Sequence, residues 1–189
     1  APTGQNPTSD ETALRRGLPT IRFTDNHKRL VLPDSSPIDI TRGFTCVAII
    51  NRTNGRVFQY ILTLGNLAVF GFVYNSLLLG NYGANTQQYN LSKEYGKNGT
   101  WAVVSATFNP NTGKASLRVD SVNIGSELHP SYTGRGFGNR VGSQGYQCIG
   151  GDGVNDRTFI GNMSFLAAYN NYMTTPELKV VEQAALAIA

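Results

Sequence analysis

The sequence predicts an all-β protein of antiparallel strands with one short helix at its C-terminal end. The first observation is a hairpin pattern over residues 99–120, where two apolar strand patterns flank the turn at residues 109–113. In that turn Pro110 presets φ and Gly113 supplies a positive φ. The second observation is composition: 21 glycines, 9 tyrosines and 9 phenylalanines, with only 15% charged residues. Such a composition is typical of many short strands joined by tight turns.

Alternation of side chains supports both strands of this hairpin. Val103, Ser105 and Thr107 alternate with Val104, Ala106 and Phe108 before the turn, and Ala115, Leu117 and Val119 alternate with Ser116, Arg118 and Asp120 after it. Successive side chains of a strand point to opposite faces of its sheet. One face of the second strand is therefore apolar and is expected to lie against a core.

The N-terminal part of the chain predicts an arm followed by two short strands. Residues 1–18 are expected to form a polar linker or extended arm, and residues 19–189 a single domain. With 189 residues and 40% hydrophobic content, the chain can bury one sizeable core. Short strands are expected at Thr20–Thr24 and Lys28–Leu32, on either side of the Asp25-Asn26 turn.

The C-terminal end predicts a helix. Thr175 can serve as N-cap, Pro176 suits the first helical position, and Glu177 faces the positive end of the helix dipole. An apolar stripe at helical spacing follows, made by Leu178, Val181 and Ala185. We expect this helix to pack on the edge of the sheet.

Four stretches of the sequence also carry a family resemblance, in order along the chain. They are Gly43–Ile50, Tyr60–Gly65, the hairpin from Gly99-Thr100-Trp101 to its Leu-x-Val-Asp end, and Phe159–Asn170 with its Tyr-Asn pair. Together they resemble the laminin-G-like, concanavalin A-like jelly rolls over roughly residues 40–182. The resemblance implies an antiparallel β-sandwich, the concanavalin A-like jelly roll, with a short C-terminal helix.

The two cysteines leave two interpretations open. Cys46 and Cys148 both lie in predicted strands, so a bridge between them is possible and would close a long loop. Alternatively, both are buried and unpaired and behave as small hydrophobic residues.

Catalysis is disfavoured by the pattern of acidic residues and histidines. Glycan-cleaving enzymes need two carboxylates projecting into one groove, and the 12 acidic residues are scattered. Asp152 and Asp156 are spaced at i and i+4, but in a loop pattern, and His27 and His129 lie in turn-like settings. Nothing resembles a nucleophile elbow, a phosphate loop or a zinc spacing. The sequence therefore predicts a protein that is not an enzyme, and a hydrolase or lyase with an atypical site is the second alternative.

A calcium site is a weaker hypothesis, and no other cofactor is predicted. Asp152, Asn155 and Asp156 offer hard oxygen ligands in a glycine-bearing loop. The three side chains do not fill a site of six to eight oxygens. The other interpretation is an Asx-rich turn between strands.

Two long polar loops are the candidate ligand sites. Residues 81–90 and 132–146 combine aromatic rings with amide and arginine side chains, which suit the apolar face and the hydroxyls of a sugar. The candidate ligand-binding residues are Tyr82, Asn85, Tyr89, Arg135, Asn139, Arg140 and Tyr146. The alternative is that the glycine-rich loop is flexible, or that it is ordered only at a subunit interface.

The net charge of +4 does not predict nucleic-acid binding. The 16 basic residues are spread singly, with Arg15-Arg16 and Lys28-Arg29 the only adjacent pairs, so no stripe follows a phosphate backbone. No apolar run approaches the ~20 residues that span a bilayer. A mild positive field favours an acidic polysaccharide or a lipopolysaccharide phosphate as partner.

The family resemblance implies a recognition function outside the cell or on a virion surface. Few cysteines and a polar leading stretch fit a bacteriophage tail, fibre or head-decoration protein better than an animal secreted protein. The leading hypothesis is a non-enzymatic, oligomeric domain of a larger virion protein that binds a host surface glycan or receptor. The alternative is a purely structural capsid-decoration or fibre-capping module that makes protein contacts.

Overall fold

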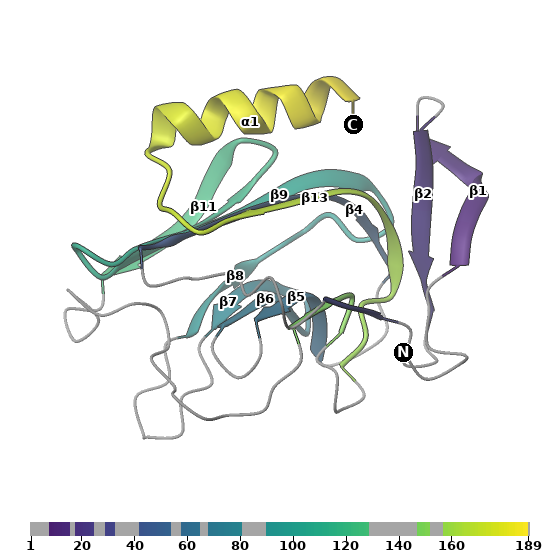
Figure 1. Cartoon of the computed structure of the whole chain (residues 1–189), viewed down its shortest axis with the longest axis horizontal. Coiled ribbons are helices and arrows are strands. Elements are labelled where there is room, and N and C mark those ends of the chain that lie inside the picture. Colours follow the sequence, from purple (N-terminus) through teal and green to yellow (C-terminus); the bar gives the residue numbers. More distant parts are fainter. Residues whose placement is uncertain are drawn as a thin grey trace.

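The protein is a sandwich of two antiparallel β-sheets with one helix on its outside (Figure 1). The computed structural model describes residues 8–15, 18–24, 29–32, 42–53, 58–64, 68–80, 90–128, 147–151 and 157–188. All strand pairs within the two sheets are antiparallel. The predicted fold class, an antiparallel β-sandwich with a short C-terminal helix, is confirmed.

The first sheet has seven strands in the order β1-β2-β13-β4-β9-β10-β11. Their bounds are β1 Thr8–Arg15, β2 Leu18–Phe23, β4 Phe44–Arg52, β9 Trp101–Asn109, β10 Lys114–Val119, β11 Val122–Leu128 and β13 Gly161–Tyr169. β2 corresponds to the strand expected at residues 20–24. β1 lies within the stretch expected to be a linker or arm and pairs with β2.

The second sheet has six strands in the order β3-β12-β5-β6-β7-β8. Their bounds are β3 Leu30–Val31, β5 Phe58–Leu64, β6 Ala68–Val73, β7 Ser76–Gly80, β8 Asn90–Glu94 and β12 Gln147–Ile149. β3 lies inside the strand expected at residues 28–32.

The predicted hairpin is present as β9 and β10. Gly113 has the positive φ that the turn requires, +70°, and its N–H donates to the Asn109 carbonyl at 2.8 Å. The side chains alternate as expected, because Val104, Ala106, Phe108, Ala115, Leu117 and Val119 all belong to the main core.

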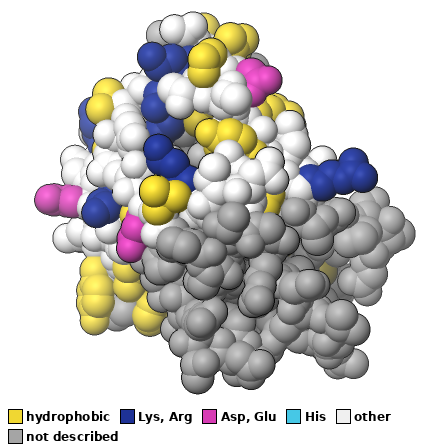
Figure 2. Space-filling view, turned by 90° about the vertical axis from the view of Figure 1, so that its left-hand side faces the viewer, with side chains coloured by type: hydrophobic (Ala, Val, Ile, Leu, Met, Phe, Trp, Pro, Cys, Tyr) yellow, Lys and Arg dark blue, Asp and Glu magenta, His cyan; other side chains and the backbone are white. Residues whose placement is uncertain are grey.

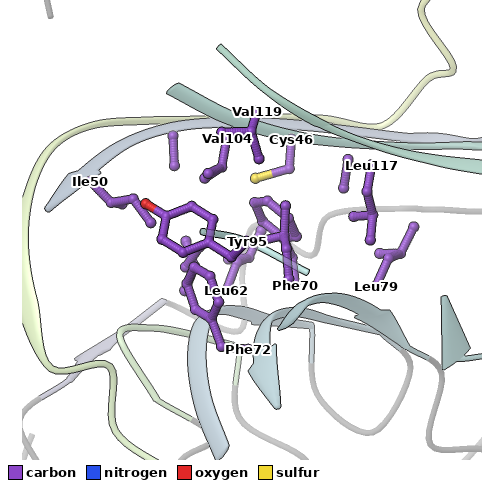
Figure 3. Packing of buried hydrophobic residues seen from close by; sticks show 14 of the residues in the cluster. Cys46, Ile50, Leu62, Phe70, Phe72, Leu79, Tyr95, Val104, Leu117 and Val119 are labelled. Atoms are coloured by element: carbon purple, nitrogen blue, oxygen red, sulfur yellow. The ribbon is translucent and has the colours of Figure 1, made fainter. Parts of the chain in front are cut away.

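This core fills the space between the two sheets (Figure 3). Cys46, Val104 and Leu117 enter it from the seven-stranded sheet, and the apolar side chains of β5, β6 and β7 face them. The Tyr95 ring packs edge-on against Phe72, with ring centroids 4.9 Å apart. Each fully buried Phe or Leu side chain contributes about 1.5–3 kcal/mol of hydrophobic stabilisation.

Neither cysteine forms a disulfide, and both are buried. Cys46 belongs to the main core, and burial raises the pKa of its thiol. Cys148 pairs with Thr63 in the other sheet. The interpretation in which Cys46 and Cys148 are not bridged therefore holds in the structure.

The C-terminal helix α1 covers the outer face of the seven-stranded sheet. It runs from Thr175 to Ile188, and Leu178 and Ala185 pack on Val47, Ile49 and Val103 of β4 and β9. The expected position at the sheet edge is wrong, because β4 and β9 are central strands whose outward side chains are apolar. Among the described residues no helix has the length and apolar character needed to cross a membrane.

The N-cap of α1 is Thr174 and not Thr175, one residue earlier than expected. The Thr174 N–H and Oγ1 both donate to Glu177 Oε2 at 2.7 Å. This contact belongs to the capping box, in which a Glu three residues into the helix bonds back to the cap.

A buried ion pair joins the same helix to the sheet. Arg118 Nε of β10 donates to Glu182 Oε1 at 2.9 Å, and Ser105 Oγ of β9 donates to the same oxygen at 2.5 Å. The side chains of Arg118 and Glu182 are only 8% and 1% exposed. The helix is therefore held by a specific polar contact as well as by apolar packing.

Candidate functional site

The two outer faces of the sandwich differ. α1 lies across the outer face of the seven-stranded sheet. The outer face of the six-stranded sheet is on the opposite side of the sandwich, and its described residues do not contact α1 (Figure 1). On that second face a separate apolar cluster is formed by Tyr60, Val69 and Leu78, with Phe58 and Val73 packed against it. We call it the Tyr60 face.

An arginine is stacked on the aromatic rings of the Tyr60 face. The Arg157 guanidinium carbon lies 5.1 Å from the Phe58 ring centroid and 5.6 Å from that of Tyr60. Arg157 Nη1 also donates to Tyr60 Oη at 2.9 Å. Cation–π contacts within about 6 Å are attractive and orient the guanidinium. Arg157 is therefore a fixed positive group beside half-buried Phe58.

Local sequence explains why these side chains meet. Phe58 and Tyr60 are two residues apart in β5, so they share a face. Tyr60 N–H donates to the Arg157 carbonyl at 3.1 Å, which places Arg157 beside the strand. Gly71, the register partner of Tyr60, permits this tight packing, because a Cβ there would lie 2.3 Å from the Gln59 carbonyl oxygen.

A second arginine lies near the same segment. The stem of Arg29 packs against Gly151, where an added Cβ would lie 3.3 Å from Arg29 Cβ. Thr63 Oγ1 donates to the Gly151 carbonyl at 2.6 Å and fixes that residue to β5. Arg29 Nε is buried and finds no hydrogen-bond acceptor within the described structure. A buried donor without a partner is costly, so an anionic ligand group nearby would be stabilising.

The predicted loop 81–90 begins and ends at one end of this sheet, and the predicted loop 132–146, which follows β11 of the other sheet, ends there. Leu64 pairs with both Ala68 and Gln147, and Gly80 pairs with Asn90 and Val69. Residues 81–89 connect Gly80 to Asn90, and residue 146 precedes Gln147. The sheet thus places the end of the second loop in the same row of residues as both ends of the first loop, although the loops lie far apart in sequence.

The predicted site residues themselves lie outside the described residues. This holds for the ligand candidates Tyr82, Asn85, Tyr89, Arg135, Asn139, Arg140 and Tyr146 and for the calcium candidates Asp152, Asn155 and Asp156. Their contribution to a site stays a prediction. Among the described residues no group of three His, Cys, Asp or Glu side chains could hold a metal ion.

Sequence reasoning missed Phe58, Tyr60 and Arg157. The signal available in the sequence for Phe58 and Tyr60 was their i, i+2 spacing in a strand that continues to Thr63. Arg157 could not be found this way, because 97 positions separate it from Tyr60 and only the sheet topology brings the two together.

The described strands of this sheet offer few acidic groups. Across β3, β5, β6, β7, β8 and β12 the one carboxylate is Glu94. A glycosidase pair needs two carboxyl groups about 5–9.5 Å apart. This part of the sheet therefore provides no such pair.

Charged side chains on one end of the molecule are interspersed. Figure 2 shows Lys and Arg side chains spread over the described part of this view, with Asp and Glu side chains among them.

Two stacked antiparallel sheets with a helix on one outer face define a β-sandwich of the jelly-roll class. No protein-family model matches the sequence, and no curated protein matches it. Solved structures do match the fold. The CBM40 domain of the Ruminococcus gnavus IT-sialidase bound to α2,3-sialyllactose has a TM-score of 0.72 at 15% identity, covering 86% of this chain and 96% of that one.

Two further solved structures contain the same fold as part of a longer chain. A leech intramolecular trans-sialidase complexed with 2,7-anhydro-Neu5Ac has a TM-score of 0.69 at 14% identity, over 87% of this chain and 26% of that chain. The binding domain of Paraclostridial Mosquitocidal Protein 1 has a TM-score of 0.67 at 12% identity, over 96% of this chain and 48% of that chain. These likenesses establish the fold.

Proposed function

We propose that this chain is a non-enzymatic glycan-binding domain that uses the Tyr60 face and the loops attached to that sheet. The observation that carries the proposal is the Arg157 guanidinium held over half-buried Phe58 and buried Tyr60, on the side of the sandwich opposite α1. Sugar sites combine a ring platform with fixed polar donors, and here the half-buried ring of Phe58 would be the platform and Arg157 the donor.

The ligand class we propose is an acidic glycan. Arg157 presents fixed N–H donors, and Arg29 carries a buried Nε without an acceptor in the described structure. Guanidinium groups suit carboxylates and phosphates because their planar donors match two oxygens at once. The net charge of +4 adds long-range attraction for such a ligand.

The solved structures of similar fold support this choice. The Ruminococcus gnavus CBM40 domain was solved with α2,3-sialyllactose and with α2,6-sialyllactose, both of which carry a carboxylate. Glycan binding forms and breaks no covalent bond. It therefore needs only residues that position the ligand and neutralise its charge.

The test is a glycan array that carries sialylated oligosaccharides, bacterial surface polysaccharides and neutral oligosaccharides, probed with and without calcium. We expect saturable binding to acidic glycans that is lost in Arg157→Gln and Phe58→Ala, and weakened in Tyr82→Ala or Arg135→Ala if the predicted loops contribute. A folded protein that binds no glycan on the array would overturn the proposal.

The biological setting belongs to the same proposal. We propose an extracellular role, with a bacteriophage appendage, a larger virion protein and a homo-oligomer as the arrangement that the sequence favours. Size-exclusion chromatography with light scattering of the purified domain tests the oligomer directly.

A further inference from the structure

Tyr74 is an exposed aromatic residue in a strained backbone conformation. It is 66% exposed and has a φ of +49°. Tyr74 and Asn75 form the two-residue turn between β6 and β7, whose flanking residues Val73 and Ser76 are paired. A positive φ at the first position of such a turn normally selects glycine. The tyrosine therefore costs stability and gains little burial in return.

This turn is held from beneath by a fully buried arginine. Arg52 is 0% exposed, and its Nη2 donates to the Tyr74 carbonyl at 2.6 Å. Two other N–H groups of Arg52 donate to neutral side chains, Nη1 to Asn98 Oδ1 at 2.7 Å and Nε to Gln59 Oε1 at 3.3 Å. The guanidinium also lies 4.3 Å from the Phe72 ring centroid. Burial of a guanidinium is expensive, so its contacts fix the turn firmly.

The second residue of the turn is fixed as well. The Asn75 carbonyl accepts the Tyr95 N–H at 2.9 Å, and Asn75 Oδ1 accepts Asn98 Nδ2 at 3.4 Å. The backbone carbonyls of both turn residues, Tyr74 and Asn75, are thus held by hydrogen bonds. A side chain on such a rigid turn is positioned before any ligand arrives, which reduces the entropy lost on binding.

The neighbours of Tyr74 connect it to the Tyr60 face. Val73 precedes it and belongs to the same apolar cluster as Tyr60. Phe58 is the register partner of Val73, and Arg157 is stacked on Phe58. By backbone position, Tyr74 therefore follows Val73, which lies opposite Phe58, the residue on which Arg157 is stacked.

We propose that Tyr74 is a preformed stacking contact for a pyranose ring of the bound glycan, next to the part of the ligand that Arg157 neutralises. This inference rests on the proposed function, since it assigns a residue of the same binding face. The physical reason is that backbone strain at an exposed residue persists where the side chain serves a function. A flat exposed ring offers the apolar face of a sugar a surface of matching shape.

The experiment compares three variants on the glycan array described above and in thermal unfolding. Tyr74→Gly removes the ring and the strain together, so we expect binding to weaken about tenfold while the Tm rises by about 2–4 °C. Tyr74→Phe keeps the ring, and its binding is expected to remain near that of the wild type. Ser121→Gly is the matched control, because Ser121 also has a positive φ, +65°, at the turn after β10. It should raise the Tm and leave binding unchanged.

The outcomes separate the two proposals. If Tyr74→Gly bound the glycan as strongly as the wild type, the stacking contact would be overturned and the proposed function would stand. Equal loss of binding in Tyr74→Phe and Tyr74→Gly would also overturn it, because the ring would then be irrelevant. A wild type that binds no glycan would overturn the proposed function, and the stacking contact with it.

Discussion

Gly161 begins β13 at a point where a side chain has no room. Its φ is +145°, and an added Cβ would lie 2.2 Å from the backbone oxygen of Asn51 in β4. Backbone atoms in a central strand cannot shift to relieve such a contact. The close approach of β13 to β4 at Gly161, where Gly161 pairs with Arg52, therefore requires a glycine.

Gly161→Ala is expected to destabilise the protein by at least about 3 kcal/mol, because strain and a backbone clash act together. The free energy of unfolding in urea measures the effect. Gly99→Ala is the matched control: Gly99 has a φ of +77° but no atom within 4 Å of an added Cβ, so about 1 kcal/mol is expected. Equal losses in the two variants would show that the clash at Asn51 is unimportant.

Single residues differ in how far the sequence alone predicts their role. Gly113 was predictable, because the Asn-Pro-Asn-Thr-Gly pattern determines the turn locally. Gly161, Arg52 and Tyr74 were not, since their constraints arise from strands that are distant in sequence. The backbone approach at Gly161 and the neutral partners of Arg52 exist only once the register of β4, β5 and β13 is set.

At the scale of elements, the attachment of helix α1 to the seven-stranded sheet offers the clearest test. Glu182 and Arg118 are 64 positions apart and form a buried ion pair below the helix. Removing one partner of such a pair leaves an uncompensated buried charge, which costs about 3–5 kcal/mol.

Glu182→Leu should therefore destabilise the protein by about 3–5 kcal/mol, measured by chemical denaturation. The double variant Arg118→Met with Glu182→Leu should recover a large part of that loss, because neither charge is then left alone. Losses that simply add in the double variant would contradict the account of α1 as a helix held by this pair.

The capping contact of α1 predicts a pH dependence. Side-chain and backbone hydrogen bonds from Thr174 lower the pKa of Glu177 in the folded state. A lowered folded-state pKa means that the charged form stabilises the fold at neutral pH, and this contribution is lost as the pH falls through the folded-state pKa.

Glu177→Gln should lower the Tm at pH 7, and the difference from the wild type should close below about pH 4. Thermal unfolding across this pH range measures it. Glu94→Gln, on an exposed strand residue, controls for the general loss of a surface charge. A difference that stays constant from pH 7 to pH 3 would exclude the charged cap as its cause.

The sequence predicted the helix and the strands themselves better than it predicted how they pack against each other. The helix, its apolar stripe and the β9–β10 hairpin follow from local periodicity, which the sequence carries directly. The position of α1 was predicted at an edge and lies on a face. The reason is that the contacts that hold it, Ser105 and Arg118, come from strands far from the helix in sequence.

At the scale of the whole molecule, the two outer faces of the sandwich are built differently. One is occupied by α1, and the other carries the Tyr60 face with Arg157 stacked on its rings. The sequence predicted aromatic and polar side chains on two loops, which stay a prediction, and it did not point to the strand residues Phe58 and Tyr60 of the proposed site. Alternation marks Phe58 and Tyr60 as facing one way without saying whether that face is core or surface.

The most direct measurement of the central claim is NMR chemical-shift mapping of the labelled domain, titrated with the glycan that gives the strongest array signal. Glycan recognition on the Tyr60 face predicts saturable shifts at Phe58, Tyr60, Val73, Tyr74 and Arg157, with the backbone signals of α1 unchanged. Shifts confined to α1 and the strands beneath it, or no saturable shift at all, would contradict the account.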